Sequence, residues 1–393
     1  MADGAARPDW LTPDYPEWRE HPPWVMSDMV LAERVLPAAI LGHPAAERVA
    51  AEVSAALRAG AGVVVTGCGT SEHAARAVAE LISEALGERS AGRVAAAQAF
   101  EAALAPRSGL CIGVSHEGST AATVAALAAA RQAGARTCLI TAAASSLAGE
   151  AADVVFPTPL RDASWCHTVG YLSPLLAGAA VAGVLAGRVP DGEALSGHLA
   201  ACDGALERLA GALGAFAGAE RLLVVGSGLD AITAAEQALK IEEGAWIPST
   251  ALPLETLLHG HLPAAGQGTG LIAFLCDPRA PARRAERTRA ALRAAEAVGV
   301  APLLLTRVDY LSELDEADAR AALALPAGDR LGLPGAFLAG AAALQRVTLA
   351  FSRLRGTNPD LLRRDDVRYR TAALLGADTQ RLSDSQRPDD TLG

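Results

Sequence analysis

Residues 63–71 read VVVTGCGTS, and this stretch decides the fold. Three successive valines, with no polar residue between them, are typical of a strand buried on both faces of a parallel sheet. The two glycines that follow allow a tight turn, and Thr70 and Ser71 stand where a helix would begin, with hydroxyls suited to its first turn. A buried strand followed by a short turn and a helix is the repeating unit of α/β domains.

Further units of this kind continue along the chain. The apolar spacing predicts helices and strands in alternation, with helices at 47–59, 71–86 and 120–133 and strands at 111–114, 137–141 and 153–156. After an alanine-rich helical stretch that starts near residue 197, a second series follows, with a strand at 222–225, a helix at 230–246 and a strand at 271–275. Such alternation predicts mainly parallel sheets with helices on both faces.

The two series are related to each other. Residues 224–228 (VVGSG) align with residues 65–69 (VTGCG), about 160 residues upstream, and this period is far longer than that of solenoid repeats. We therefore predict a duplicated domain. The expected parts are a Trp/Pro-rich N-terminal arm at 1–45, a first α/β domain at 46–196, a second at 197–370, and a polar C-terminal tail at 371–393.

The composition restricts the class of protein. The formal net charge is −10 with acidic residues spread along the chain, so nucleic acid is not an expected partner. The six cysteines show no CxxC spacing, and the first residues lack the pattern of a signal peptide. The longest weakly polar run, 173–187, is shorter than the roughly 20 residues needed to cross a bilayer. We expect a cytoplasmic protein with no membrane partner, in which this run forms a buried helix.

Two polar turns suggest a ligand site. The segments GCGTS (67–71) and SHEGST (115–120) each follow a predicted strand and open a helix, where free N–H groups and the helix dipole attract anions. Parallel α/β sheets bind ligands at the edge where the strands end. The candidate substrate-binding residues are Gly69, Thr70, Ser71, Ser115, His116, Glu117, Ser119 and Thr120. Helix capping alone explains either turn equally well.

The corresponding turns of the second copy have a different character. Residues 226–230 read GSGLD and residues 276–278 read CDP, so acidic and apolar groups replace most of the hydroxyls. Only the first copy is therefore expected to bind an anionic or polyhydroxy ligand.

The second copy has a charged helix instead. Glu236, Lys240 and Glu243 follow a spacing of four and three residues, which puts them on one face of the predicted helix. A row of surface ion pairs is the commoner explanation, but Lys240 is the only lysine in the chain. His259 and His261 lie downstream in a Gly/Pro-flanked loop, where imidazoles can transfer protons near neutral pH. No set of metal ligands accompanies them.

Five segments occur in a telling order: GCGTSEHA (67–74), SHEGST (115–120), EQALKIEE (236–243), ETLLHGH (255–261) and GTNPD (356–360). Together they resemble the SIS (sugar isomerase) family, specifically the isomerase half of glucosamine-6-phosphate synthase and its stand-alone relatives. The resemblance implies two tandem SIS domains, each a mainly parallel five-stranded sheet of the flavodoxin-like kind. It also implies that the two polar turns hold a sugar or sugar phosphate.

The resemblance further implies roles for single residues. Glu243 matches the glutamate that moves a proton between C1 and C2 of the open-chain sugar, and Lys240 matches the lysine beside it. His259 matches the histidine that assists ring opening, often in the site of a neighbouring subunit, so a homodimer is expected. This chemistry requires no cofactor and no metal.

Departures from the family pattern bear on the ligand and the activity. Glu117 replaces a serine, and its charge would repel a phosphate unless it caps its helix, is offset by Arg76, Arg161 or Arg368, or marks a different ligand. Val367 falls where the family has a lysine that reaches the sugar carbonyl. The chain also starts without the glutamine-amidotransferase domain of the synthase, so isomerisation or amine release is expected in place of amination.

These observations leave three hypotheses. The first is a sugar-phosphate isomerase or an amino-sugar-phosphate deaminase, and the second is a non-catalytic regulator that binds a sugar or sugar phosphate. The third, a dinucleotide-dependent oxidoreductase, is weak because the glycine turns lack GxGxxG spacing.

Overall fold

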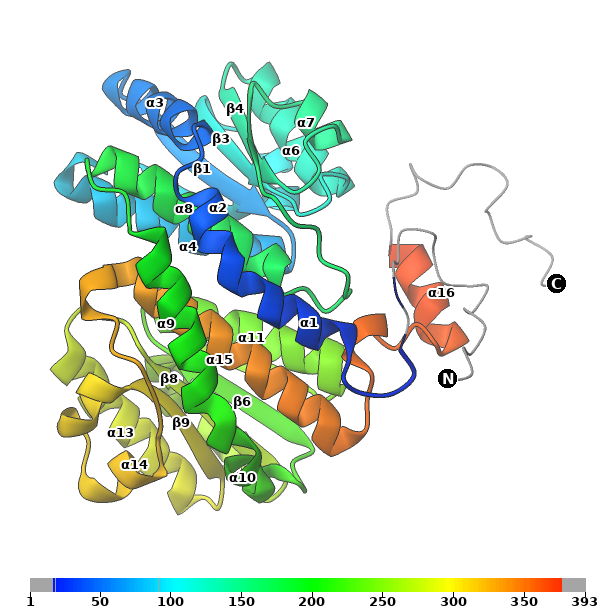
Figure 1. The fold of residues 1–393 in the computed structure, drawn as a ribbon, viewed down its shortest axis with the longest axis vertical. Coiled ribbons are helices and arrows are strands. Elements are labelled where there is room, and N and C mark those ends of the chain that lie inside the picture. The colour runs from blue at the N-terminus through cyan, green and yellow to red at the C-terminus, as the bar shows by residue number, and fades with distance from the viewer. Residues whose placement is uncertain (1–16, 18, 91, 377–393) are drawn as a thin grey trace.

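The chain folds around two parallel five-stranded sheets (Figure 1). A computed structural model describes residues 17, 19–90 and 92–376. The first sheet has the order β2-β1-β3-β4-β5, from β1 (Gly62–Gly67), β2 (Val94–Gln98), β3 (Gly109–Val114), β4 (Arg136–Thr141) and β5 (Val154–Pro157). The second has the order β10-β9-β8-β6-β7, from β6 (Arg221–Gly226), β7 (Ser249–Pro253), β8 (Thr269–Leu275), β9 (Ala301–Arg307) and β10 (Leu323–Leu325). The predicted tandem α/β fold is confirmed.

Helices cover both sheets and also join them. The helices of the first half are α1 (Val25–Ala32), α2 (Leu36–Ile40), α3 (Ala45–Arg58), α4 (Thr70–Leu86), α5 (Ala99–Leu104), α6 (Ala121–Gln132), α7 (Leu147–Glu150) and α8 (Val169–Leu185). Those of the second half are α9 (Gly192–Ala205), α10 (Leu209–Ala212), α11 (Leu229–Ala245), α12 (Leu254–Thr256), α13 (Pro281–Ala297), α14 (Glu316–Ala321), α15 (Gly332–Arg355) and α16 (Val367–Gly376). Helices α4 and α8 pack on α11 and α15 between the two sheets (Figure 1).

The apolar helices lie in this shared core. Helix α8 contains residues 173–185 of the run predicted to be a buried helix, and nearly all of the helix is buried, whereas residues 186 and 187 lie beyond its end and are exposed. Helix α15 is long and apolar enough to cross a bilayer, but 83% of that stretch is buried inside the protein. It packs against α11 and α9, so its apolar character is explained by the core of the fold.

The same strand-to-helix turn occurs in both halves. A Cβ atom at Gly67 would lie 2.5 Å from the backbone oxygen of Ser71, and one at Gly226 would lie 2.3 Å from that of Asp230. Only glycine allows the backbone to approach the following helix so closely. The duplication inferred from these residues is therefore a duplication of local geometry.

The segment GTNPD (356–360) ties the chain ends to the core. The buried carboxylate of Asp360 accepts hydrogen bonds from the backbone N–H groups of Val25 and Met26, each at 2.8 Å, and so caps the start of α1. The hydroxyl of Thr357 donates to the carbonyl oxygen of Gly244, at the end of α11, at 2.7 Å. Trp24 is buried beside this junction, whereas Trp10 and Trp18 of the predicted arm lie outside the described residues.

Replacing Asp360 by alanine should lower the free energy of unfolding by roughly 1 to 3 kcal/mol, because two buried N–H groups would lose their acceptor. Urea unfolding followed by circular dichroism measures this loss. The exposed neighbour Asp365 supplies the matched control, since Asp365→Ala removes a carboxylate from the surface. Equal stability of the two variants would refute the capping role.

Candidate functional site

A pocket of about 350 Å3 lies where the strands of the first sheet end. Three parts of the chain line it: the turn from β1 to α4, the turn from β3 to α6 with the segment after β5, and the end of α11 with the segment before α16. The lining residues are Cys68, Gly69, Thr70, Ser71, His116, Glu117, Ser119, Thr120, Trp165, His167, Glu243, Leu362 and Arg364. All the predicted binding residues except Ser115 are among them, and Ser115 is buried.

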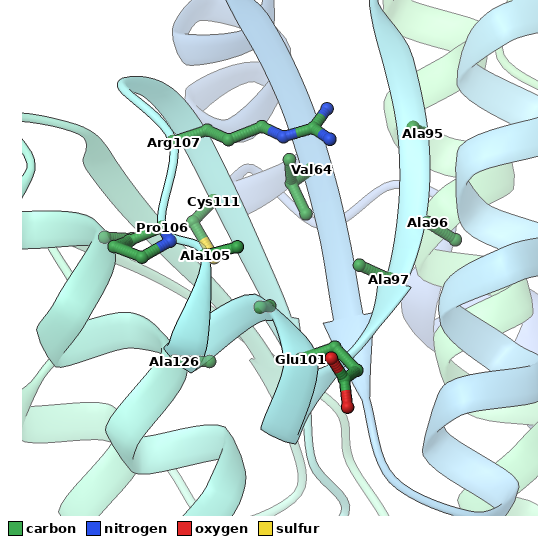
Figure 2. A pocket seen from close by; sticks show the side chains of 12 residues that line it. Val64, Ala95, Ala96, Ala97, Glu101, Ala105, Pro106, Arg107, Cys111 and Ala126 are labelled. Atoms are coloured by element: carbon green, nitrogen blue, oxygen red, sulfur yellow. The ribbon is translucent and has the colours of Figure 1, made fainter.

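A second pocket, of about 210 Å3, lies on one face of the first sheet beside α5 and α6 (Figure 2). Alanines form much of its wall, and Glu101 and Arg107 are its only charged side chains. It contains none of the predicted site residues. The pocket at the end of the strands is therefore the candidate site.

The ammonium group of Lys240 joins the two halves of the candidate site. Its Nζ donates to Thr70 Oγ1 at 2.8 Å and to Glu243 Oε2 at 2.6 Å, and lies 3.4 Å from Glu236 Oε1. The side chain of Lys240 is 1% exposed and that of Glu236 is 0% exposed. A row of surface ion pairs is therefore the wrong explanation for this helix face. Lys240 connects α11 of the second half to α4 of the first.

The charged groups in this cluster shift one another's pKa values. Burial alone would lower the pKa of Lys240, but the nearby carboxylates of Glu243 and Glu236 outweigh it and raise this pKa, so the side chain stays an ammonium. Burial raises the pKa of Glu243, against the opposing effect of Lys240. Burial also acts to raise the pKa of Glu236, yet Lys240 and His73 lower it overall. His73 Nδ1 lies 2.7 Å from Glu236 Oε2, a second link between α4 and α11.

His116 is held as a neutral group. Its Nε2 accepts a hydrogen bond from the backbone N–H of Asp162 at 2.8 Å, which leaves the proton on Nδ1. Burial lowers its pKa to about 4. The Asp162 carboxylate in turn accepts from the backbone N–H groups of Thr168 and Gly170, at 2.6 and 3.1 Å. His116 is thus oriented as a fixed hydrogen-bonding group and not as a cation at neutral pH.

The charge of Glu117 has a partner. Its Oε1 accepts from Arg161 Nη2 at 3.3 Å, and both side chains are about half exposed. Of the three arginines considered as compensators, Arg161 is the one that contacts it. Arg368 instead pairs with Asp366 on the surface, and Arg76 is exposed outside the pocket lining.

One arginine of the pocket, Arg364, was not predicted from the sequence. Arg364 lines the pocket, and its guanidinium lies 4.4 Å from the centre of the Trp165 ring. Val367, which matched the family's lysine, is 60% exposed at the start of α16 and does not line the pocket. The sequence shows two adjacent arginines, Arg363 and Arg364, after GTNPD, but it does not indicate which of them points toward the site.

His259 lies outside the pocket of its own chain. Its side chain is 76% exposed and its Nε2 is 3.3 Å from Glu255 Oε2. The geometry of a single chain therefore does not bring His259 to Glu243. Among the described residues, no group of three or more His, Cys, Asp or Glu side chains could hold a metal ion.

The corresponding turn of the second half is filled by its own side chains. Asp277 Oδ2 accepts from the backbone N–H of Leu229, at the start of α11, at 3.0 Å. Arg279 and Arg284 pair with the same carboxylate at 2.7 and 3.2 Å. An internal carboxylate thus occupies the start of this helix, where an anion could otherwise bind.

Replacing Lys240 by methionine should lower the free energy of unfolding at pH 8 by about 3 to 5 kcal/mol, because the buried carboxylate of Glu236 and the partly buried one of Glu243 would lose their cation. The raised pKa of Lys240 means that its contribution is fully present below the ordinary lysine pKa and is lost only as the pH rises through the raised value. In the variant, burial alone should raise the carboxyl pKa values, so the deficit should shrink at pH 5. Urea unfolding at both pH values tests this, and the double variant Lys240→Met, Glu236→Gln should recover part of the loss. An equal deficit at both pH values would contradict it.

The chain is similar to known proteins in sequence and in fold. Residues 58–182 match the family of SIS domains. The chain is 28% identical over 241 residues to the glutamine–fructose-6-phosphate aminotransferase (isomerizing) of Symbiobacterium thermophilum; the match covers 57% of this chain and 39% of the length of that relative.

Two solved structures share the fold across nearly their whole length. The C-terminal domain of the glucosamine-fructose-6-phosphate aminotransferase of Francisella tularensis has a TM-score of 0.70 at 18% identity, covering 87% of this chain and 98% of that one. The tagatose-6-phosphate ketose/aldose isomerase of Escherichia coli has a TM-score of 0.68 at 16% identity, covering 86% and 95%. Residues 58–182 thus match a SIS domain, and the chain as a whole shares with these structures the fold of two parallel five-stranded sheets flanked by helices.

Proposed function

We propose that this protein is an aldose–ketose isomerase or an amino-sugar deaminase that acts on a sugar phosphate in the pocket beside Glu243. One observation carries the proposal. Glu243 lies in the same pocket as the hydroxyl-bearing turns of the other SIS domain, and Lys240 bridges it to Thr70. A carboxylate is thereby fixed beside a place that suits a polyhydroxy ligand. The names of an isomerizing aminotransferase and a ketose/aldose isomerase among the similar proteins support the same chemistry.

Both candidate reactions transfer one proton between two carbon atoms of the sugar, C2 and C1. In the isomerase, the Glu243 carboxylate removes the proton from C2 of the open-chain aldose and returns it to C1, while the hydroxyl proton on O2 passes to O1. In the deaminase, the same transfer turns a 2-amino aldose into a ketose imine, and water releases ammonia from it. Both reactions conserve atoms and electrons, and they differ only in the group on C2.

The surroundings of Glu243 suit a base of this kind. Burial raises its pKa above the usual value, which makes the carboxylate a stronger base than an exposed one. The Lys240 ammonium opposes this shift and favours the ionised form of the carboxylate. Hydroxyl and phosphate oxygens of a ligand could hydrogen-bond to the neutral imidazole of His116 and to four hydroxyl groups. These belong to Thr70, Ser71, Ser119 and Thr120.

Glu243→Gln should lower the rate of proton exchange at C2 by about a hundredfold to ten-thousandfold, because the amide cannot accept the proton. The measurement is deuterium incorporation at C2 of glucose 6-phosphate in heavy water, followed by NMR. The native rate should fall as the pH drops through a pKa above that of an ordinary glutamate, since only the ionised carboxylate is a base.

The neighbouring residue gives a matched control. Glu242 lies on the same helix but does not line the pocket, and its carboxylate accepts from the backbone N–H of Ser249 at 3.1 Å. Glu242→Gln keeps an oxygen for this bond and should leave exchange unchanged. Native-like exchange in the Glu243 variant would reject its role, and a native chain that binds sugar phosphate without exchange would favour a sugar-binding regulator.

We further propose that the active form is a homodimer in which His259 reaches the pocket of the partner subunit. His259 is exposed and does not line the pocket of its own chain. Glu243 also lines a further opening of about 430 Å3, which is distinct from the two pockets described above.

We also propose a cytoplasmic location for the protein, which the free state of all six cysteines supports.

Mixing two inactive variants tests the proposed homodimer. Glu243→Gln and His259→Asn should each be inactive alone, but their mixed dimers should regain about a quarter of the native activity if one intact pocket forms in half of the dimers, which is random pairing of equal amounts. The assay is isomerisation after refolding the two chains together. Mixtures no more active than either variant alone would refute the arrangement across subunits, and a fully active His259→Asn chain would place His259 outside the reaction.

A further inference from the structure

The cations around the pocket differ in the number of protein groups that they already contact. Lys240 donates to Thr70 and Glu243 and lies beside Glu236, so its ammonium is surrounded by protein acceptors. Arg161 pairs with Glu117 at 3.3 Å. The Lys240 ammonium cannot bind a ligand without losing a protein contact, and Arg161 does not line the pocket.

Arg364 is the exception. Its side chain is partly buried and lines the pocket, and its guanidinium stacks over the Trp165 ring at 4.4 Å. No carboxylate or carbonyl oxygen of the described residues pairs with its side chain. A guanidinium carries five N–H donors in a planar array that matches the oxygens of phosphate and carboxylate groups. Burial also lowers its pKa, as is usual for a cation without a close anion, although Glu243 and Glu117 oppose the shift.

The backbone before Arg364 fixes its direction. Leu362 and Arg363 both adopt left-handed conformations, with φ of 47° and 60°, which non-glycine residues rarely do. Arg363 lies 4.7 Å from the Trp246 ring and 4.1 Å from the Tyr369 ring, in the opening on the other side of Leu362. The two adjacent arginines are therefore held in different openings, with only Arg364 in the candidate site. Such strain persists only where the surrounding contacts impose it.

Glu117 restricts where an anion can bind in the same pocket. It stands in the turn between β3 and α6, where the family resemblance places a phosphate-binding serine, and its carboxylate can only accept hydrogen bonds. A phosphate beside it would be repelled, whereas one beside Arg364 would be attracted.

We propose that Arg364, supported by Trp165, binds the anionic group of the sugar ligand, a phosphate monoester or a carboxylate. This assignment rests on the proposed function for the location of the ligand, and it defines the substrate class as anionic sugars. Trp165 holds the planar guanidinium while leaving its N–H edge for the ligand oxygens.

The test compares three sugars that differ only at C6: glucose 6-phosphate, glucuronate and glucose. Isothermal titration should show that Arg364→Gln weakens the binding of the preferred anionic sugar by roughly ten- to hundredfold, the range for a hydrogen-bonded ionic contact, and leaves glucose unchanged. Arg364→Lys should fall between the native chain and Arg364→Gln, because a point charge lacks the paired donors. The comparison of the first two sugars decides between phosphate and carboxylate.

Arg363→Gln is the matched control, since it removes the same charge from the same turn but from the other opening, and it should bind like the native chain. An unchanged affinity of Arg364→Gln for the anionic sugars, an equal loss for glucose, or a native chain that binds neither anionic sugar would overturn the proposal. Binding through Arg364 without proton exchange at C2 would refute only the proposed reaction. Exchange that persists with no dependence on Arg364 would refute only this assignment.

Discussion

The buried ammonium of Lys240 is the interaction on which the arrangement of the site depends. A charge removed from water is tolerated only when nearby groups compensate it, and here the compensation comes from both halves of the molecule. Two carboxylates on α11 and a hydroxyl on α4 meet at one nitrogen. The position of Glu243 relative to the first sheet is thereby fixed by a contact that would be costly to break. The contact that joins the two halves is therefore also part of the candidate site.

The two halves share a strand-to-helix turn but differ in what fills it. Both halves place a glycine turn before a helix, so both generate a helix N-terminus at the edge of a sheet. In the second half, Asp277 and its two arginines satisfy this N-terminus internally. In the first half, the turn keeps hydroxyls and borders a pocket. The turn of the second copy is therefore filled by its own side chains, while the turn of the first copy borders a pocket.

The sequence predicted the features that depend on local pattern. Uninterrupted apolar runs predicted the central strands, and the helical spacing placed Glu236, Lys240 and Glu243 on one face. Four strands, β2, β7, β9 and β10, were not predicted. For the edge strand β2 the reason is that its sequence VAAAQ has a weak apolar signal and little β-branching. The side chain of Arg364 was missed for another reason: its direction follows from two left-handed residues before it, and neither is a glycine that would announce such a turn. The exposed position of His259 could not be predicted either, since periodicity does not describe an irregular loop.

The segment from 356 to 364 shows how stability and recognition are connected in this protein. Its first part caps α1 through Asp360 and holds the end of α11 through Thr357, both by buried hydrogen bonds. Its last part turns through Leu362 and Arg363 to bring Arg364 over Trp165, whose backbone N–H donates to the carbonyl oxygen of Asp360 at 3.1 Å. The residue that anchors the chain ends therefore also positions the aromatic ring beneath the arginine. Because the unfavourable turn follows directly on this anchor, the buried contacts of Asp360 can hold a pocket residue in a conformation that the local sequence alone would not favour.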